Sequence, residues 1–133
     1  MKYSKALREC IESAFLVASH FDAEYLESWH LLIAMANHSY SVAGATLNEF
    51  PYEIDRLEEV VVELTETQYS DKEHYQELPF SHRLKVLLLE AEHISSVVHA
   101  KILGTEHVLY AILHDGNALA TRILEKAGFS YED

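Results

Sequence analysis

Apolar residues recur along most of the chain at spacings of three and four, which is the period of an amphipathic α-helix and not of a strand. After Ser4, for example, the apolar positions of the first segment are Leu7, Ile11, Ala14 and Ala18. Similar segments follow one another to the end of the sequence, separated by short polar stretches. We therefore predict an all-α fold.

The segment after Gly104 has a different pattern. From Val108 to Leu113 the sequence is apolar nearly all round, which predicts a helix in the interior of the fold. Gly104 is expected to take a positive φ before this helix, and Thr105 is expected to cap it. Glu106 would then lie in the first turn, where a carboxylate complements the helix dipole, and would emerge at the surface.

The remaining segments can be placed in order along the chain. The pattern predicts helices at residues of about 4–22, 28–36, 41–47, 51–64, 81–95, 105–113 and 118–126. Residues suited to begin helices are Ser4, Ser41, Pro51 and Ser81, and Gly128 is suited to end the last one.

The chain contains an internal duplication. A shift of 77 residues, which takes His30 to His107, aligns residues 26–35 with residues 103–112 without a gap. Identical pairs on both sides include Ser4 with Ser81, Leu7 with Leu84, Ala14 with Ala91, Ala23 with Ala100 and Ala43 with Ala120. About ten identities fall in this match, and apolar residues face apolar residues at most other positions. We predict two tandem pseudo-twofold repeats of about four helices each.

The boundaries of the repeats follow from a change in composition. Residues 68–80 are polar and unpatterned before Leu78 and Pro79, so they are predicted to be a linker. The first repeat is then residues 1–67 and the second is residues 81–133. The second repeat is expected to be shorter or truncated, because it stops where a counterpart of the Pro51 helix would begin.

Composition and charge exclude several classes of function. The 133 residues are 49% hydrophobic and 24% charged, which suits a globular domain with a core of its own. A net charge of −12 argues against nucleic acid and anionic membranes as partners, because their phosphates attract basic surfaces. The sequence has no membrane-length apolar run and no signal-peptide pattern near its first residue. One cysteine, Cys10, on the apolar face of the first helix, excludes an internal disulfide, and we expect a cytoplasmic location.

Two motifs in the second repeat carry a resemblance to a known family. Gly104-Thr105-Glu106-His107 follows a helix opened by Phe80-Ser81-His82-Arg83. With the tandem repeat, these motifs resemble the amino-terminal domain of the Clp family of ATP-driven protein unfoldases, most of all the ClpC type, over essentially the whole chain. The resemblance implies a binding domain without catalytic machinery. The phosphate-loop pattern Gly-x-x-x-x-Gly-Lys-Ser/Thr is absent, so ATP and Mg²⁺ are expected only in ATPase domains outside this sequence.

The resemblance also implies partners. ClpC-type domains dock adaptor proteins such as MecA and recognise substrates, including proteins marked by phosphorylated arginine, for a hexameric unfoldase that feeds a Clp protease. A phosphoarginine reader needs an anion cradle beside a carboxylate. We expect the Ser81 hydroxyl, the first amides of its helix and Arg83 to form the cradle, and Glu106 to accept from the guanidinium N–H groups.

The first repeat departs from this pattern. Trp29 stands where the second repeat has Glu106, and Ala6 stands where it has Arg83. An indole ring has no acceptor for a guanidinium N–H group, although it can stack on one. We therefore expect one intact site and a degenerate first-repeat site around Ser4 and Trp29, with Trp29 as an alternative apolar anchor for an adaptor.

Simpler interpretations stand beside these expectations. Glu106 and Arg83 can be first-turn charges with no role in binding. His30 and His107, one in each repeat, are expected to be buried and bonded to backbone carbonyls. Cys10 is expected to be a core residue. A free-standing helical interaction module would carry the same features.

A metal enzyme is the alternative from a different class. Glu-x-x-His occurs at residues 27–30 and 90–93, with the spacing that places two ligands on one helix face in ferritin-like di-metal bundles. The two motifs do not occupy equivalent positions in the two repeats, as a paired metal site requires. We therefore expect no metal site.

Overall fold

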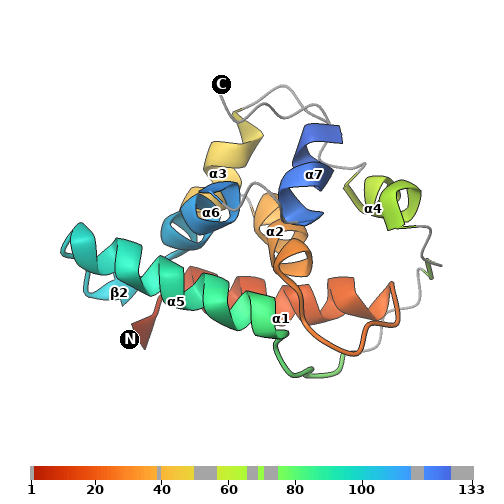
Figure 1. The fold of residues 1–133 in the computed structure, drawn as a ribbon, viewed down its shortest axis with the longest axis horizontal. Helices are drawn as coiled ribbons and strands as arrows, with labels where there is room; N and C mark the ends of the chain where they lie inside the picture. Colours follow the sequence, from red (N-terminus) through yellow and green to blue (C-terminus); the bar gives the residue numbers. More distant parts are fainter. Residues whose placement is uncertain are drawn as a thin grey trace.

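Helices dominate the computed structural model, which describes residues 2–38, 40–49, 57–65, 69–70, 75–114 and 119–126. The predicted all-α fold is confirmed (Figure 1). The helices are α1 (Lys5–Ser19), α2 (Ser28–Asn37), α3 (Val42–Asn48), α4 (Leu57–Thr65), α5 (His82–Val97), α6 (Thr105–His114) and α7 (Leu119–Lys126), and the strands β1 (Lys2–Tyr3) and β2 (Ile102–Leu103) have two residues each. In the described part of the chain, no helix combines the length and the apolar character that a membrane span requires.

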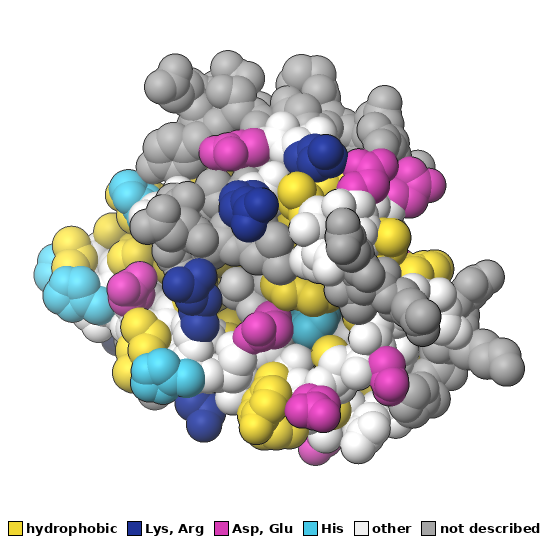
Figure 2. Space-filling view, turned by 45° about the vertical axis from the view of Figure 1, so that its right-hand side comes forward, with side chains coloured by type: hydrophobic (Ala, Val, Ile, Leu, Met, Phe, Trp, Pro, Cys, Tyr) yellow, Lys and Arg dark blue, Asp and Glu magenta, His cyan; other side chains and the backbone are white. Residues whose placement is uncertain are grey.

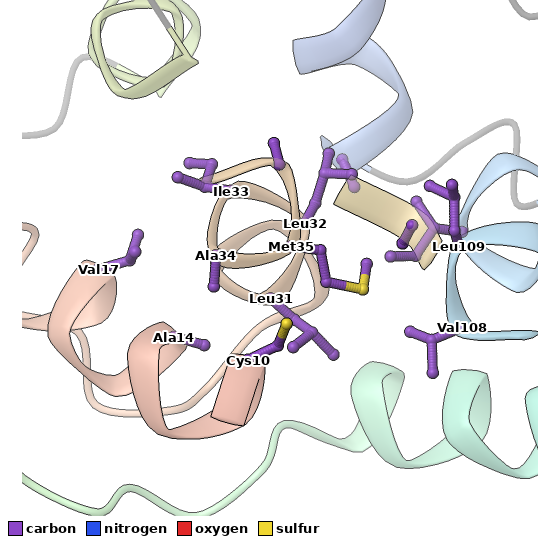
Figure 3. Close-up of a cluster of buried hydrophobic side chains, with 14 of the residues drawn as sticks. Cys10, Ala14, Val17, Leu31, Leu32, Ile33, Ala34, Met35, Val108 and Leu109 are labelled. Carbon is purple, nitrogen blue, oxygen red and sulfur yellow. The ribbon is translucent and has the colours of Figure 1, made fainter. Parts of the chain in front are cut away.

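Helix α2 lies at the centre of the core. Eight of its ten residues are buried, including Leu31, Leu32 and Met35. It packs against α1, α3, α5, α6 and α7. Figure 3 shows its side chains between Cys10 of α1 and Val108 of α6. A helix that is apolar nearly all round needs neighbours on every side, and this position supplies them.

The two halves of the chain have the same structure. A shift of 77 residues carries both bounds of α2 onto those of α6. The same shift carries α1 onto α5 and α3 onto α7, with the same first residue and a last residue that differs by one. Backbone conformation is repeated as well. Among the described non-glycine residues, Asp22 (φ 51°) and His99 (φ 62°) have positive φ, and they are equivalent positions of the two repeats. The predicted tandem repeats are confirmed. Helix α4 has no counterpart among the described residues.

Short parallel pairings join the two repeats. Tyr3 pairs with Leu103 in β1 and β2, and Leu26 pairs with Phe80 at the equivalent place. The backbone N–H of Ser4 donates to the Leu103 carbonyl at 2.8 Å, and that of Ser81 donates to the Leu26 carbonyl at 3.0 Å. The pairings therefore cross between the repeats. The segment before α1 pairs with the segment before α6, and the segment before α5 pairs with the segment before α2.

The predicted serine caps are confirmed. The Ser4 hydroxyl accepts from the N–H of Leu7, and the Ser81 hydroxyl accepts from the N–H of Leu84, both at 3.1 Å. The Ser41 hydroxyl accepts from the N–H of Gly44 at 2.9 Å and begins α3 in the same way. Each hydroxyl satisfies one of the amides that a helix start leaves without an intrahelical partner.

The predicted turn before α6 was wrong in two respects. Thr105 is the first residue of the helix and not its cap, and its hydroxyl accepts from the N–H of Ala43 at 3.1 Å, so it satisfies an amide at the start of α3. Gly104 does not have positive φ. The left-handed residue of this connection is His99, five positions earlier.

The structure does not test some of the predictions made from the sequence. Pro51 and Gly128 lie outside the described residues. The division into residues 1–67, 68–80 and 81–133 stays a prediction. The last two residues of the predicted linker, Pro79 and Phe80, contact Leu26 through the backbone.

Replacing Gly44 by alanine should destabilise the fold. An added Cβ would collide with the His38 carbonyl oxygen and lie 2.6 Å from that of Met35, and backbone atoms at the end of α2 cannot move aside easily. We expect the free energy of unfolding in urea to fall by about 1–2 kcal/mol, although alanine favours helices. Gly104→Ala is the control, because its Cβ would meet only the flexible Glu106 carboxylate. Equal losses in the two variants would contradict this account.

Candidate functional site

The strand pairings create two surface junctions, each made of two helix starts. The first junction is the start of α1 (Ser4 and Lys5) beside the start of α6 (Gly104 and Glu106), joined by the hydrogen bond from Ser4 to Leu103. The second junction is its pseudo-symmetric counterpart, in which the start of α5 lies beside the start of α2. Figure 1 shows the two junctions near opposite ends of α5.

The structure does not bring the predicted site residues together. Ser81 and Arg83 lie at the start of α5, in the second junction, whereas Glu106 lies at the start of α6, in the first junction. The 16 residues of α5 span about 24 Å at the usual helical rise. Ser4, which was assigned to the other site, is the cap that accompanies Glu106. Each predicted site was therefore assembled from one repeat, whereas each junction is built from both.

The first junction combines an acid with a base. The Glu106 side chain is 45% exposed, and one of its oxygens lies 3.7 Å from Nδ1 of His107. Lys5 is exposed in the first turn of α1. The Ser4 hydroxyl caps α1 by accepting from the N–H of Leu7, and the positive end of the helix dipole lies at this cap, next to Lys5. Sequence reasoning missed Lys5, which follows the cap in the aligned position of His82.

The second junction has different chemistry. Arg83 is exposed near the start of α5, and Glu27 precedes α2. Trp29 is only partly exposed, because its ring packs edge-on against Phe21 with the ring centroids 5.0 Å apart. Part of the indole is therefore committed to the core. The role of Trp29 as an adaptor anchor stays a prediction.

The paired histidines orient the helix starts. Nδ1 of His30 accepts from the backbone N–H of Glu27 at 2.8 Å, and Nδ1 of His107 accepts from that of Gly104 at 2.9 Å. The expected bonds to carbonyls were wrong, because each ring acts as an acceptor. His30 is fully buried and desolvation lowers its pKa to about 3, so its ring is neutral at pH 7.

Cys10 and the possible metal ligands can be placed in the same way. Cys10 is buried in the core as predicted, and burial raises its pKa to about 11, which keeps the thiol protonated at neutral pH. Among the residues that the structure describes, no three histidine, cysteine, aspartate or glutamate side chains lie close enough to hold a metal ion. His30 of the first Glu-x-x-His motif is buried and caps its own helix.

The fold and the junctions define a class: a helical domain built from two interlocked repeats. Comparison with known families identifies the family of this domain. The family model described as the Clp repeat (R) N-terminal domain matches residues 2–127, and the chain belongs to this family. Clp N domains are binding domains of Clp ATPases that recognise substrates or adaptors.

Known relatives agree with this assignment. The chain is 26% identical over 102 residues to the chaperone protein ClpB of Oceanobacillus iheyensis, covering 76% of this chain and 12% of that protein. It is 25% identical over 125 residues to a probable ATP-dependent Clp protease ATP-binding subunit of Chlamydia pneumoniae, covering 93% and 15%. The chain therefore spans less than a sixth of the length of either relative.

Solved structures share the fold at low sequence identity. The N-terminal domain of the chaperone ClpD from Arabidopsis thaliana has a TM-score of 0.77 at 19% identity, over 98% of this chain and 88% of that one. The Hsp104 N-terminal domain from Candida albicans has a TM-score of 0.73 at 20% identity, over 99% and 85%. A ClpV N-domain in complex with a VipB peptide has a TM-score of 0.71 at 20% identity, over 98% and 81%.

The buried ring of His30 should make stability depend on pH. Its pKa is about 3 in the folded protein and about 6.5 when unfolded, so between these values only the unfolded chain binds the proton. Stability from this group is complete above pH 6.5 and falls as the pH falls. We expect it to contribute a loss of about 2–3 kcal/mol between pH 7.5 and pH 4.5.

The matched variant is His30→Gln, which keeps an acceptor at the third helical position and removes the titration. Urea unfolding of both proteins at pH 7.5 and pH 4.5 separates this contribution from that of the carboxylates. The wild type should lose more stability than the variant on acidification. Equal losses would show that His30 is not held neutral by burial.

Proposed function

We propose that this chain is the substrate- and adaptor-recognition domain of a ClpC-type unfoldase that delivers proteins to a Clp protease. The observation that supports this most strongly is the family match over residues 2–127. A relative with the same fold, the ClpV N-domain, has been solved in complex with a peptide, which supports peptide binding by this fold. ATP and Mg²⁺ would be used by ATPase domains elsewhere in the parent hexamer, and the location would be cytoplasmic.

For marked substrates, we propose that a phosphoarginine binds at the first junction. Glu106 would accept two N–H groups of the planar guanidinium, a geometry that carboxylates favour. The amides at the start of α1 and the Lys5 ammonium would hold the phosphoryl group. This assignment keeps Glu106 from the sequence-based prediction and replaces Ser81 and Arg83 by Ser4 and Lys5, because only these lie beside α6.

The second junction lacks an acid at the position of Glu106. We propose that it serves a MecA-like adaptor instead, with the exposed part of Trp29 and the Arg83 guanidinium as contacts. Tryptophan and arginine are the residue types that most often dominate the energy of a protein interface. Adaptor and marked substrate would then bind at different places and could be tested separately.

Glu106→Ala should weaken phosphoarginine binding without unfolding the domain. Loss of a charge-assisted pair with the guanidinium should raise the Kd of a phosphoarginine peptide by about tenfold or more, measured by isothermal titration calorimetry. The melting temperature should change little, because the side chain is half exposed at the surface. A large fall in melting temperature would instead assign Glu106 a structural role.

Lys5→Ala and Arg83→Ala form a matched pair that distinguishes the two junctions. Both remove one exposed cation from the first turn of a helix, Lys5 from α1 in the first junction and Arg83 from α5 in the second. Only Lys5→Ala should weaken phosphoarginine binding, by about three- to tenfold. The opposite result, or two equal sites in the wild-type titration, would overturn the assignment to the first junction.

A further inference from the structure

The outer side of α5 carries an exposed apolar surface, which we call the α5 face. Its described apolar residues are Val86, Leu89, Val97, Val98 and Ile102. Leu89, Val97 and Val98 are 65%, 63% and 62% exposed. Positions 86, 89 and 97 follow helical spacing, so they form one stripe on the side opposite the buried residues Leu84 and Ala91. Exposed apolar residues that share one side of a helix are a feature of protein interaction sites.

The first repeat provides an internal comparison. Under the shift of 77 residues, Val86 corresponds to Glu9 and Leu89 corresponds to Glu12. Both acids lie on the outer side of α1, and Glu9 contacts His38 at 3.0 Å. The same backbone position is thus charged in one repeat and apolar in the other. The apolar stripe is therefore not a requirement of the fold.

The charged residues near the stripe also differ between the repeats, with acids in the first and basic or histidine residues in the second. Asp22 and Glu24 of the first repeat correspond to His99 and Lys101 of the second. The basic and histidine side chains at or beside the α5 face are Arg83, Lys85, Lys101, His82, His93 and His99, and the acids are Glu90 in the middle and Glu92 on the side of Lys85. The chain as a whole has a net charge of −12, but on this surface the basic and histidine side chains outnumber the acidic ones. Figure 2 shows hydrophobic side chains and histidines gathered at the left of the molecule.

In the first repeat the positions equivalent to Val97 and Val98 are covered from within the chain. The N–H of Ser70 donates to the carbonyl of His20 at 2.9 Å, and the Tyr69 ring packs against His20 and Phe21 with centroid distances of 5.4 and 5.5 Å. His20 and Phe21 correspond to Val97 and Val98. A segment that carries a tyrosine thus covers the end of α1, while exposed valines occupy the same positions at the end of α5.

We propose that the α5 face docks an extended segment of another protein that carries an aromatic side chain next to acidic residues. The aromatic ring would pack on Val97 and Val98 as Tyr69 packs on the end of α1, and Leu89 would extend the apolar contact. The acids would lie at the two ends of the face, toward Arg83 and toward Lys101, away from Glu90. The proposal goes beyond phosphoarginine recognition, since neither Ser4 nor Glu106 takes part in it.

Charge decides between such a segment and a second copy of this chain. Two copies with a net charge of −12 each would repel one another on approach. A short acidic segment carries far less charge in total and would meet the basic and histidine side chains that border the stripe. The segment is therefore the occupant that the surface favours.

A peptide with the sequence of residues 68–78, Gln-Tyr-Ser-Asp-Lys-Glu-His-Tyr-Gln-Glu-Leu, is a suitable probe, because it contains the tyrosine that covers α1 and three acids. Titrated into the ¹⁵N-labelled chain, it should shift backbone amide resonances within residues 82–103. A second peptide with lysine at the three acidic positions should bind about tenfold more weakly. Absence of shifts at millimolar peptide, or shifts on α1 instead, would overturn the proposal.

Leu89→Glu restores the acid found at the equivalent position of α1, where the fold tolerates it, and should weaken binding about tenfold. Val42→Glu is the control, because Val42 is also an exposed aliphatic residue, at 54%, on a different helix. Equal affinity of the two variants would overturn the proposal. So would a dimer in light scattering that Leu89→Glu dissociates, because a second copy would then occupy the face. Phosphoarginine binding should be unchanged in Leu89→Glu, so failure here leaves the first junction unaffected.

Discussion

The exchange of strands between the repeats is the constraint that determines which helix starts lie side by side at the surface. Tyr3 pairs with Leu103, and Phe80 pairs with Leu26, so neither repeat completes its own helix starts. Two hydrogen bonds, from Ser4 and Ser81, hold these pairings against the ends of the first helices. A parallel pair this short has little stability alone. It persists because the buried helices α2 and α6 already hold the two halves together.

The exchange also determines what each surface contains. Because each junction takes one helix start from each repeat, a substitution in one half alters a site shared with the other. The first junction has Lys5 at one helix start and Glu106 at the other, and the second has Arg83 at one helix start and Trp29 at the other. Duplication therefore produced two sites of the same shape, and divergence of a few side chains gave them different chemistry. The outer sides of α1 and α5 differ from each other in the same way.

Much of the fold could be predicted from the sequence because its causes are local or periodic. Serine caps act within three residues, and helical spacing identifies the buried face, so Ser4, Ser81 and the core positions were found correctly. The duplication predicted equivalent structure in the two halves, and α2 and α6 match it residue for residue. Even the buried state of Cys10 follows from its place on an apolar face.

The composition of the candidate site could not be predicted in the same way. A two-residue strand has no alternation to detect, so nothing local indicated that Tyr3 pairs with Leu103 and not with Leu26. The correct grouping of Ser4 with Glu106 depends on that pairing. The Thr105 hydroxyl was misplaced for a similar reason, since its partner, the N–H of Ala43, is distant in sequence. Both the strand pairing and the partner of the Thr105 hydroxyl depend on contacts between residues far apart in the sequence.

Distances between spin labels test the exchanged arrangement most directly. In a Cys10→Ala background, nitroxides would be attached at positions 5 and 106 in one protein and at positions 83 and 106 in another. The account predicts a short distance for the first pair and a distance longer by about 10 Å or more for the second, because α5 separates the two junctions. A shorter distance between positions 83 and 106 than between positions 5 and 106 would contradict it.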